Sequence, residues 1–308
     1  MTHHHPDRAD PATPRPFGRL LTAMVSPFSP DGALDLDGAA RLAGYLVDEQ
    51  DNDALVVNGT TGESPTTTDA EKERLIRAVV SAVGDRTRVV AGIGTNDTRH
   101  TIELAVAAEK AGAHGLLVVT PYYNKPPQAG LLRHFTAVAD ATGLPVMLYD
   151  IPGRTGTPIA TETLVRLAEH DRIVAVKDAK GDLTATSWVT SRTDLAYYSG
   201  DDAMTLPLLS VGGIGLVGTS THLTGALAKQ LIEAYERGEV AAARALHQRL
   251  LPLFTGIFRT QGTILVKAAM AALGLPAGPV RPPLVDATDA ELTQLRRDCA
   301  DAGLDLPA

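Results

Sequence analysis

The sequence has little of what several protein classes require. Only one cysteine, Cys299, occurs in 308 residues, so no internal disulfide can form and a reducing compartment is expected. No run of about 18 apolar residues is present, as a membrane-spanning helix would need. No apolar segment follows a basic start, as in a secretory signal. We therefore expect a cytoplasmic protein that makes no contact with a membrane.

The chain also lacks a basic stripe. The net charge of -8 is spread along the sequence, which argues against nucleic-acid binding and favours a small-molecule substrate. Three histidines, His3 to His5, lie in a leader rich in proline and charge. We expect residues 1–17 to be a disordered leader that holds no metal ion.

The remainder alternates short apolar runs with segments of helical period, which is typical of repeated βα units. Eight strands are predicted over 20–27, 54–59, 89–94, 115–121, 145–151, 173–178, 195–200 and 213–219. Eight helices follow them in turn, over 35–49, 69–83, 98–111, 128–141, 161–170, 183–190, 203–211 and 224–237. Strict alternation favours a (β/α)8 TIM barrel over 18–238. An open doubly wound sheet is the structural alternative, but no GxGxxG follows the first strand.

Beyond Gly238 the alternation stops. Helices are predicted over 240–258, 263–273 and 289–302, with no strand between them. We therefore expect a C-terminal helical domain over 239–308.

A lysine stands near the end of the sixth predicted strand. In the run Ile173 to Asp178, a period of two places Lys177 on the same face as Ile173 and Ala175. If that face points into the barrel, burial lowers the pKa of the amine and makes it available as a nucleophile for a ketone. A lysine that pairs with a carboxylate or extends to the rim is the alternative.

Polar side chains end three other strands. The second strand runs into a Gly-Thr-Thr-Gly turn at 59–62, which suits a carboxylate, although ordinary helix capping would use the same residues. The loop after the fourth strand presents Tyr122 and Tyr123, one of which could be a packing residue. The fifth strand brings Tyr149 and Arg154 to the same rim, where a phenol can move protons and a guanidinium can bind a carboxylate. A structural ion pair is the alternative for Arg154.

These segments resemble the dihydrodipicolinate synthase and N-acetylneuraminate lyase superfamily over nearly the whole chain after the leader. The resemblance rests on the Gly59 to Glu63 turn, the Tyr122-Tyr123 pair and Lys177, in that order along the chain. Two features are similar to the synthase subgroup: the Thr-Thr pair, where the lyases carry Ser-Thr, and Arg154 after Ile151-Pro152-Gly153. The resemblance implies condensation of pyruvate with aspartate semialdehyde to 4-hydroxy-tetrahydrodipicolinate, in lysine and diaminopimelate biosynthesis.

The resemblance also implies roles for single residues. Lys177 would form the pyruvate imine, and Tyr149 would transfer protons during imine formation and cyclisation. Arg154 would bind the carboxylate of the semialdehyde. The other implied positions are Thr61 and the amide of Thr60 on the pyruvate carboxylate, Thr60 and Tyr123 in a proton relay, and Gly200 and Val217 with backbone lining the pyruvate pocket. No metal or organic cofactor is implied.

An assembly is implied as well, because Tyr123 in this superfamily reaches the site of a neighbouring subunit. We therefore expect a homo-oligomer, usually a homotetramer built as a dimer of dimers.

Three departures from the family pattern stand out. Asp150 replaces a common asparagine, and its carboxylate could shift the pKa of Tyr149. Val217 replaces a common isoleucine. In lysine-regulated members the effector pocket carries histidines and a glutamate, whereas the matching positions here are Asp69, Lys72 and His100, and only Ser64, Asn96 and Tyr122 of the pocket remain. Without the glutamate that would bind the effector's ammonium, we expect weak or no feedback inhibition by lysine.

Two other functions remain open on sequence alone. The chain could be another pyruvate aldolase, acting on N-acetylneuraminate or a 2-keto-3-deoxy sugar acid. It could also be a non-catalytic binding protein, but such a member would normally have lost the imine lysine or a phenol.

Overall fold

The computed structural model describes residues 15–307, and eight parallel strands form its centre. The strands follow the chain in order, and β8 closes the barrel by pairing with β1. Their bounds are β1 Leu20–Ala23, β2 Ala54–Val57, β3 Arg88–Gly92, β4 Gly115–Val119, β5 Val146–Asp150, β6 Ile173–Asp178, β7 Ala196–Ser199 and β8 Gly215–Gly218. The prediction of a closed (β/α)8 barrel is confirmed. Most predicted strands were one to four residues too long.

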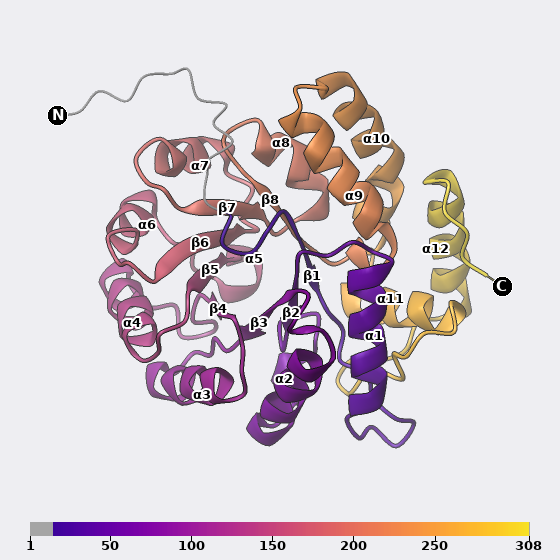
Figure 1. Ribbon diagram of the computed structural model, residues 1–308, viewed down its shortest axis with the longest axis horizontal. Coiled ribbons are helices and arrows are strands. Elements are labelled where there is room, and N and C mark those ends of the chain that lie inside the picture. The colour runs from indigo at the N-terminus through magenta and orange to yellow at the C-terminus, as the bar shows by residue number, and fades with distance from the viewer. Residues whose placement is uncertain (1–14, 308) are drawn as a thin grey trace.

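Helices surround the barrel in the predicted positions (Figure 1). They are α1 Leu36–Asp48, α2 Asp69–Val83, α3 Thr98–Lys110, α4 Gln128–Asp140, α6 Thr161–Leu167, α7 Leu183–Thr190, α8 Thr205–Leu209 and α9 Thr221–Glu236. Three short elements are also present: α5 Pro152–Thr155 and the 3-10 turn Ser64–Thr66, which were not predicted, and the 3-10 turn Asp202–Met204, which begins the helix predicted over 203–211. All three follow the carboxyl end of a strand, so they shape the same rim of the barrel.

Local sequence explains where some of these helices begin and end. Thr68 and Glu71 form a reciprocal capping box at the start of α2, and Thr288 and Glu291 form another at the start of α12 Asp289–Asp301. After α3, Gly112 adopts a φ of +91°, which an L side chain would oppose.

The barrel interior is filled by a cluster of apolar side chains from every strand. Ala175 belongs to this cluster, and Tyr149 stands directly opposite Lys177 in the pairing of β5 with β6. The expectation that Ile173 shares this face is wrong, because Ile173 packs in the outer core instead. The reason is a register shift between β5 and β6 at Val146 and Met147, which breaks the alternation at the start of β6.

The expected leader contains one structured part. Phe17 is fully buried in the interior cluster, and its ring occupies the space that a Cβ at Gly115 would need. The barrel therefore begins before the expected boundary at residue 18, and residues 1–14 lie outside the described residues.

Three further helices, α10 Val240–Gly256, α11 Gly262–Ala272 and α12, gather on one side of the barrel beside α9 and α1 (Figure 1). Side chains of all three join the apolar cluster that packs the barrel helices against the strands, including Leu253, Leu265 and Leu295. The C-terminal helices thus share a core with the barrel. None of the helices described between residues 15 and 307 is long and apolar enough to cross a membrane.

Candidate active site

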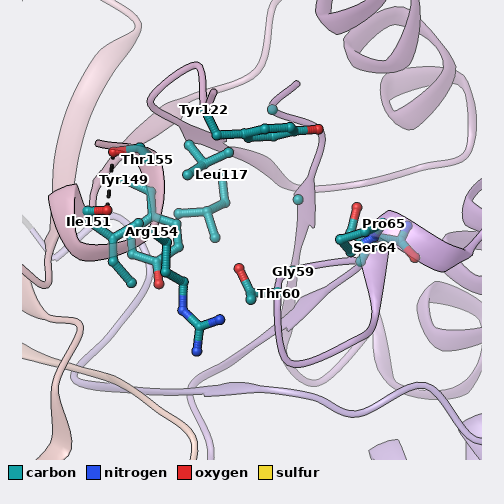
Figure 2. A pocket seen from close by; sticks show the side chains of 14 residues that line it. Gly59, Thr60, Ser64, Pro65, Leu117, Tyr122, Tyr149, Ile151, Arg154 and Thr155 are labelled. Atoms are coloured by element: carbon teal, nitrogen blue, oxygen red, sulfur yellow. Dashed lines mark hydrogen bonds between the residues drawn. The ribbon is translucent and has the colours of Figure 1, made fainter. Parts of the chain in front are cut away.

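A cavity of about 240 Å³ opens at the carboxyl ends of the strands. Its walls include Thr60, Tyr149 and Arg154, three of the residues expected to act in the reaction. Figure 2 shows the guanidinium of Arg154 directed towards Thr60, with Tyr149 beside it and Ser64 on the other wall. The site thus lies where parallel barrels place their active sites.

Lys177 is not among the residues that line this cavity, but it lies against Tyr149, which is one of them, and is 5% exposed. Its Nζ is 4.3 Å from the centre of the Tyr149 ring, and it has no carboxylate partner among residues 15–307. Burial lowers the pKa of Lys177 to about 8, with Asp202 opposing the change and Arg154 adding to it. A pKa of about 8 leaves roughly one tenth of the amine neutral at pH 7, compared with well under one in a thousand at the ordinary value, so a nucleophile is available.

Gly200 lies against the aliphatic part of Lys177. A Cβ at Gly200 would come within 3.0 Å of Cγ and Cε of the lysine. The absence of a side chain at this position therefore gives Lys177 the space it occupies.

Tyr149 is 6% exposed and faces Lys177 from the neighbouring strand. Burial raises its pKa to about 12, while the charge of Arg154 and hydrogen bonding to Thr60 act in the opposite direction. The phenol therefore keeps its proton at neutral pH. It can supply that proton to a group at the amine and recover it through Thr60.

Asp150 lies on the outer side of the same strand. Its carboxylate is fully buried, accepts a hydrogen bond from the amide of Ile159 and lies 3.2 Å from Nζ of Lys180. Burial raises the pKa of Asp150 to about 6, and Lys180 opposes that rise. The expectation that Asp150 could shift the pKa of Tyr149 is not supported, because burial, Arg154 and Thr60 account for that shift.

The turn over Gly59–Glu63, here called the glycine-threonine turn, offers free backbone donors. Within residues 15–307, the amides of Thr60 and Thr61 donate to no other protein group. Thr61 is 9% exposed, and its hydroxyl lies 3.3 Å from that of Thr219. Free amides beside hydroxyl groups are suited to a carboxylate.

Arg154 extends from the short helix α5 into the cavity. A hydrogen bond of 3.1 Å from the Thr155 hydroxyl to the Ile151 carbonyl holds this helix (Figure 2). Over the described part of the chain, Arg154 forms no ion pair with a carboxylate, which contradicts the structural alternative. Its guanidinium is available to an anionic substrate.

The two loop tyrosines point in different directions. Tyr122 is 39% exposed and lines the cavity, whereas Tyr123 is 89% exposed and does not. Tyr123 also adopts a φ of +74°, a backbone conformation that L residues disfavour. Tyr123 is therefore presented outwards, away from the cavity of its own chain. Three other expected residues, Thr61, Gly200 and Val217, are not among those lining the cavity, and Val217 lies in the barrel interior.

The six positions of the expected effector pocket are only partly brought together. Ser64 and Tyr122 line the cavity itself, whereas Asp69 and Lys72 border a separate space of about 10 Å³. His100 pairs with Asp69 at 2.9 Å, and the buried ammonium of Lys72 donates to the carbonyl of Thr67. The carbonyl of Asn96 accepts a hydrogen bond from Asn124. Asp69, the one acidic side chain among these six, is thus already engaged by His100.

One residue close to the amine was not predicted. Asp202 is fully buried and accepts hydrogen bonds from the amides of Thr219 and Ser220 and from the Ser220 hydroxyl. Its charge raises the pKa of Lys177. The only sequence signal was its position directly after the seventh strand, where acidic residues are also common as helix caps.

A family model, curated sequences and solved structures were compared with this chain, and all three point to one protein family. A family model described as the dihydrodipicolinate synthetase family matches residues 16–302. The 4-hydroxy-tetrahydrodipicolinate synthase of Acidothermus cellulolyticus is 73% identical over 290 residues, which cover 94% of each chain. The 4-hydroxy-tetrahydrodipicolinate synthase 2 of Streptomyces coelicolor is 63% identical over 97% of this chain and 100% of its own.

Among solved structures, DHDPS from Cyanidioschyzon merolae with lysine bound superimposes with a TM-score of 0.92. It is 45% identical and covers 94% of this chain and 100% of its own. The similarity therefore extends over the barrel and the C-terminal helices alike.

Proposed function

The chain belongs to the dihydrodipicolinate synthetase family, and from that membership we infer its activity. It is an enzyme that condenses pyruvate with L-aspartate 4-semialdehyde to 4-hydroxy-tetrahydrodipicolinate, a step of lysine and diaminopimelate biosynthesis. The single observation that carries the chemistry is the buried amine of Lys177, whose pKa is lowered to about 8 beside the phenol of Tyr149. A neutral amine in an apolar barrel is the nucleophile that imine formation requires.

We propose that the reaction begins with pyruvate held by the glycine-threonine turn. The free amides of Thr60 and Thr61 receive its carboxylate, and the Lys177 amine attacks its ketone carbon. Tyr149 donates one proton to the oxygen and the attacking nitrogen gives up a second, so the oxygen leaves as water and a protonated imine remains on Lys177. Its high pKa supports this role, because the phenol carries a proton to give.

The protonated imine then acts as an electron sink. Loss of one methyl proton gives an enamine, whose carbon attacks the aldehyde of the second substrate and forms the new carbon–carbon bond. The aldehyde oxygen takes up a proton and becomes the hydroxyl. The amino group of the semialdehyde portion then attacks the imine carbon, displaces the Lys177 amine and closes the ring.

We propose that Arg154 selects the second substrate by binding its carboxylate. The support is its position over the cavity without an acidic partner in residues 15–307. The charge of Arg154 acts on the Lys177 amine, which is compatible with one short amino acid aldehyde reaching both groups. The observation favours the condensation over cleavage of a long polyhydroxy acid, which is the alternative activity.

The assembly and location are also proposals. The outward position of Tyr123 supports a homo-oligomer in which this phenol completes the relay in a neighbouring copy, with a homotetramer as the expected form. The buried single cysteine is compatible with the cytoplasm.

We further propose that lysine inhibits this enzyme weakly or not at all. The relative from Cyanidioschyzon merolae was solved with lysine bound. In this chain, Lys72 lies at one expected pocket position and Asp69 is already paired with His100. An incoming ammonium would find a buried cation nearby and no free carboxylate among the six positions.

Trapping with borohydride tests the function. Pyruvate and borohydride should add a stable mass to one peptide, with the label on Lys177, and Lys177→Ala should abolish both label and synthase turnover. Condensation of pyruvate with the semialdehyde should far exceed cleavage of N-acetylneuraminate. Label on Lys180, the nearby lysine paired with Asp150, would contradict the mechanism.

A further inference from the structure

Helix α11 reaches under the glycine-threonine turn from the C-terminal part of the chain. The hydroxyl of Thr263 donates to the carbonyl of Thr61 at 3.0 Å, and both side chains are buried. One turn of helix further, Nζ of Lys267 lies 2.6 Å from Oε1 of Glu63, with side-chain exposures of 3% and 1%. Two residues of α11 thus hold two residues of the turn.

The turn requires such support because its backbone is unusual. Glu63 adopts a φ of +57°, as does Asn58 just before the turn, although neither is glycine. The amide of Arg281 donates to Oε2 of Glu63 at 2.8 Å, and the Ser26 hydroxyl donates to the carbonyl of Gly62 at 2.6 Å. With these groups engaged below, the amides of Thr60 and Thr61 remain without a protein acceptor in the described part of the chain.

The ammonium of Lys267 is buried and has further contacts besides Glu63. Its ammonium donates to the carbonyl of Pro279 at 2.8 Å and lies 4.1 Å from the centre of the Phe28 ring, which is 2% exposed. Buried ion pairs contribute little net stability compared with apolar substitutes, and in some proteins they serve to specify one local arrangement. Beneath a ligand-binding turn, such a pair can fix the position of the turn backbone.

We propose that Thr263 and Lys267 are positioning residues for pyruvate, which keep the glycine-threonine turn in the conformation that receives the substrate carboxylate. The proposal rests on the proposed function, in which Thr60 and Thr61 hold that carboxylate. It gives the C-terminal helices a part in substrate binding. A simple fastening role for α11 would affect stability and leave the affinity for pyruvate unchanged.

The first test replaces Thr263 by valine, which keeps the branched shape and removes the hydroxyl. The KM for pyruvate should rise about threefold to tenfold, as expected for one lost hydrogen bond, while kcat and the KM for the semialdehyde stay within about twofold. The pyruvate concentration that gives half-maximal borohydride trapping should rise in parallel. Thr263→Ser should restore the wild-type values. Thr163→Val, at a similarly buried threonine of α6, is the matched control and should change none of them.

The second test concerns the ion pair. Lys267→Met alone would leave a buried carboxylate uncompensated, so the variant to compare is Glu63→Gln combined with Lys267→Met, which removes both charges. This double variant should fold and should raise the pyruvate KM about tenfold or more, again without a matching change for the semialdehyde.

The outcomes separate the two proposals. If wild-type enzyme is not trapped by pyruvate, the proposed function fails. If wild-type is trapped but Thr263→Val and the double variant bind pyruvate as wild-type does, the positioning role is refuted. A lowered melting temperature with unchanged KM values, or an equal rise in both KM values, would refute it as well.

Discussion

Replacement of Lys177 by methionine should stabilise the protein while it abolishes turnover. Methionine has a similar length and no charge, so it should fill the space beside Gly200 and Tyr149. The wild-type chain, in contrast, must keep an amine in the barrel interior at 5% exposure. Catalytic function here is maintained at the expense of folding free energy.

The size of the effect follows from the pKa of the amine. Burial moves it from an ordinary value of 10.5 to about 8. Since one pKa unit corresponds to about 1.4 kcal/mol, the folded state is destabilised by about 3 kcal/mol at pH 7, where both folded and unfolded chains are protonated. Between about pH 8 and 10.5 the unfolded chain binds the proton and the folded chain does not. The free energy of unfolding therefore rises with pH in this window, and the destabilisation fades.

Urea unfolding at several pH values and one protein concentration measures this difference. The advantage of Lys177→Met over wild-type should fall by about 2 to 3 kcal/mol between pH 7 and pH 10. Changes in packing contribute equally at every pH, so they do not alter this trend. Lys110→Met, at an exposed lysine that ends α3, is the control and should show no comparable fall. A difference between Lys177→Met and wild-type that stays constant from pH 7 to pH 10 would refute the reasoning.

Three other outcomes are expected. Arg154→Lys should raise the KM for the semialdehyde about tenfold, because an ammonium cannot donate two parallel hydrogen bonds to a carboxylate as a guanidinium does. Pyruvate trapping at Lys177 should be retained. An unchanged KM would argue against Arg154 as the carboxylate ligand. Tyr123→Phe and Lys177→Ala should each have little activity alone and regain part of it when refolded together, if the phenol serves a neighbouring copy; no recovery in a mixed oligomer would count against this. Steady-state assays with added L-lysine should give an inhibition constant above about 1 mM, since a lost charge-assisted contact weakens binding about tenfold or more. A sub-millimolar constant would contradict this expectation.

Strand and helix periodicity predicted the barrel because each unit carries its own signal. The sixth strand was predicted over Ile173 to Asp178, and the structure has those bounds. The face of Ile173 was wrong because a register shift against β5 breaks the period of two, and such a shift depends on the neighbouring strand. Helix α5 was missed because four residues are too short to show a helical period.

The candidate site was predicted where its residues lie at strand ends, since the barrel brings all of those to one rim. Thr60, Tyr149 and Arg154 do line one cavity, and Lys177 contacts Tyr149. The support under the site could not be predicted in this way. Thr61 and Thr263 are 202 positions apart, and only closure of the barrel against the C-terminal helices brings them into contact.

Asp202 and Arg154 both act on the charge of Lys177, and their effects differ during the reaction. Asp202 is fully buried, which raises the pKa of its carboxyl group, whereas hydrogen bonds from Ser220 and Thr219 lower that pKa and hold the carboxylate in place. It opposes the neutral amine that attacks pyruvate, yet it stabilises the protonated imine that forms next. Arg154 has the opposite effect, because it favours the neutral amine while the site is empty. In the proposed mechanism, the semialdehyde carboxylate bound to Arg154 would offset that positive charge and shift the field around Lys177 in favour of the cationic intermediate. Binding of the second substrate would thus adjust the electrostatics for the step in which it reacts.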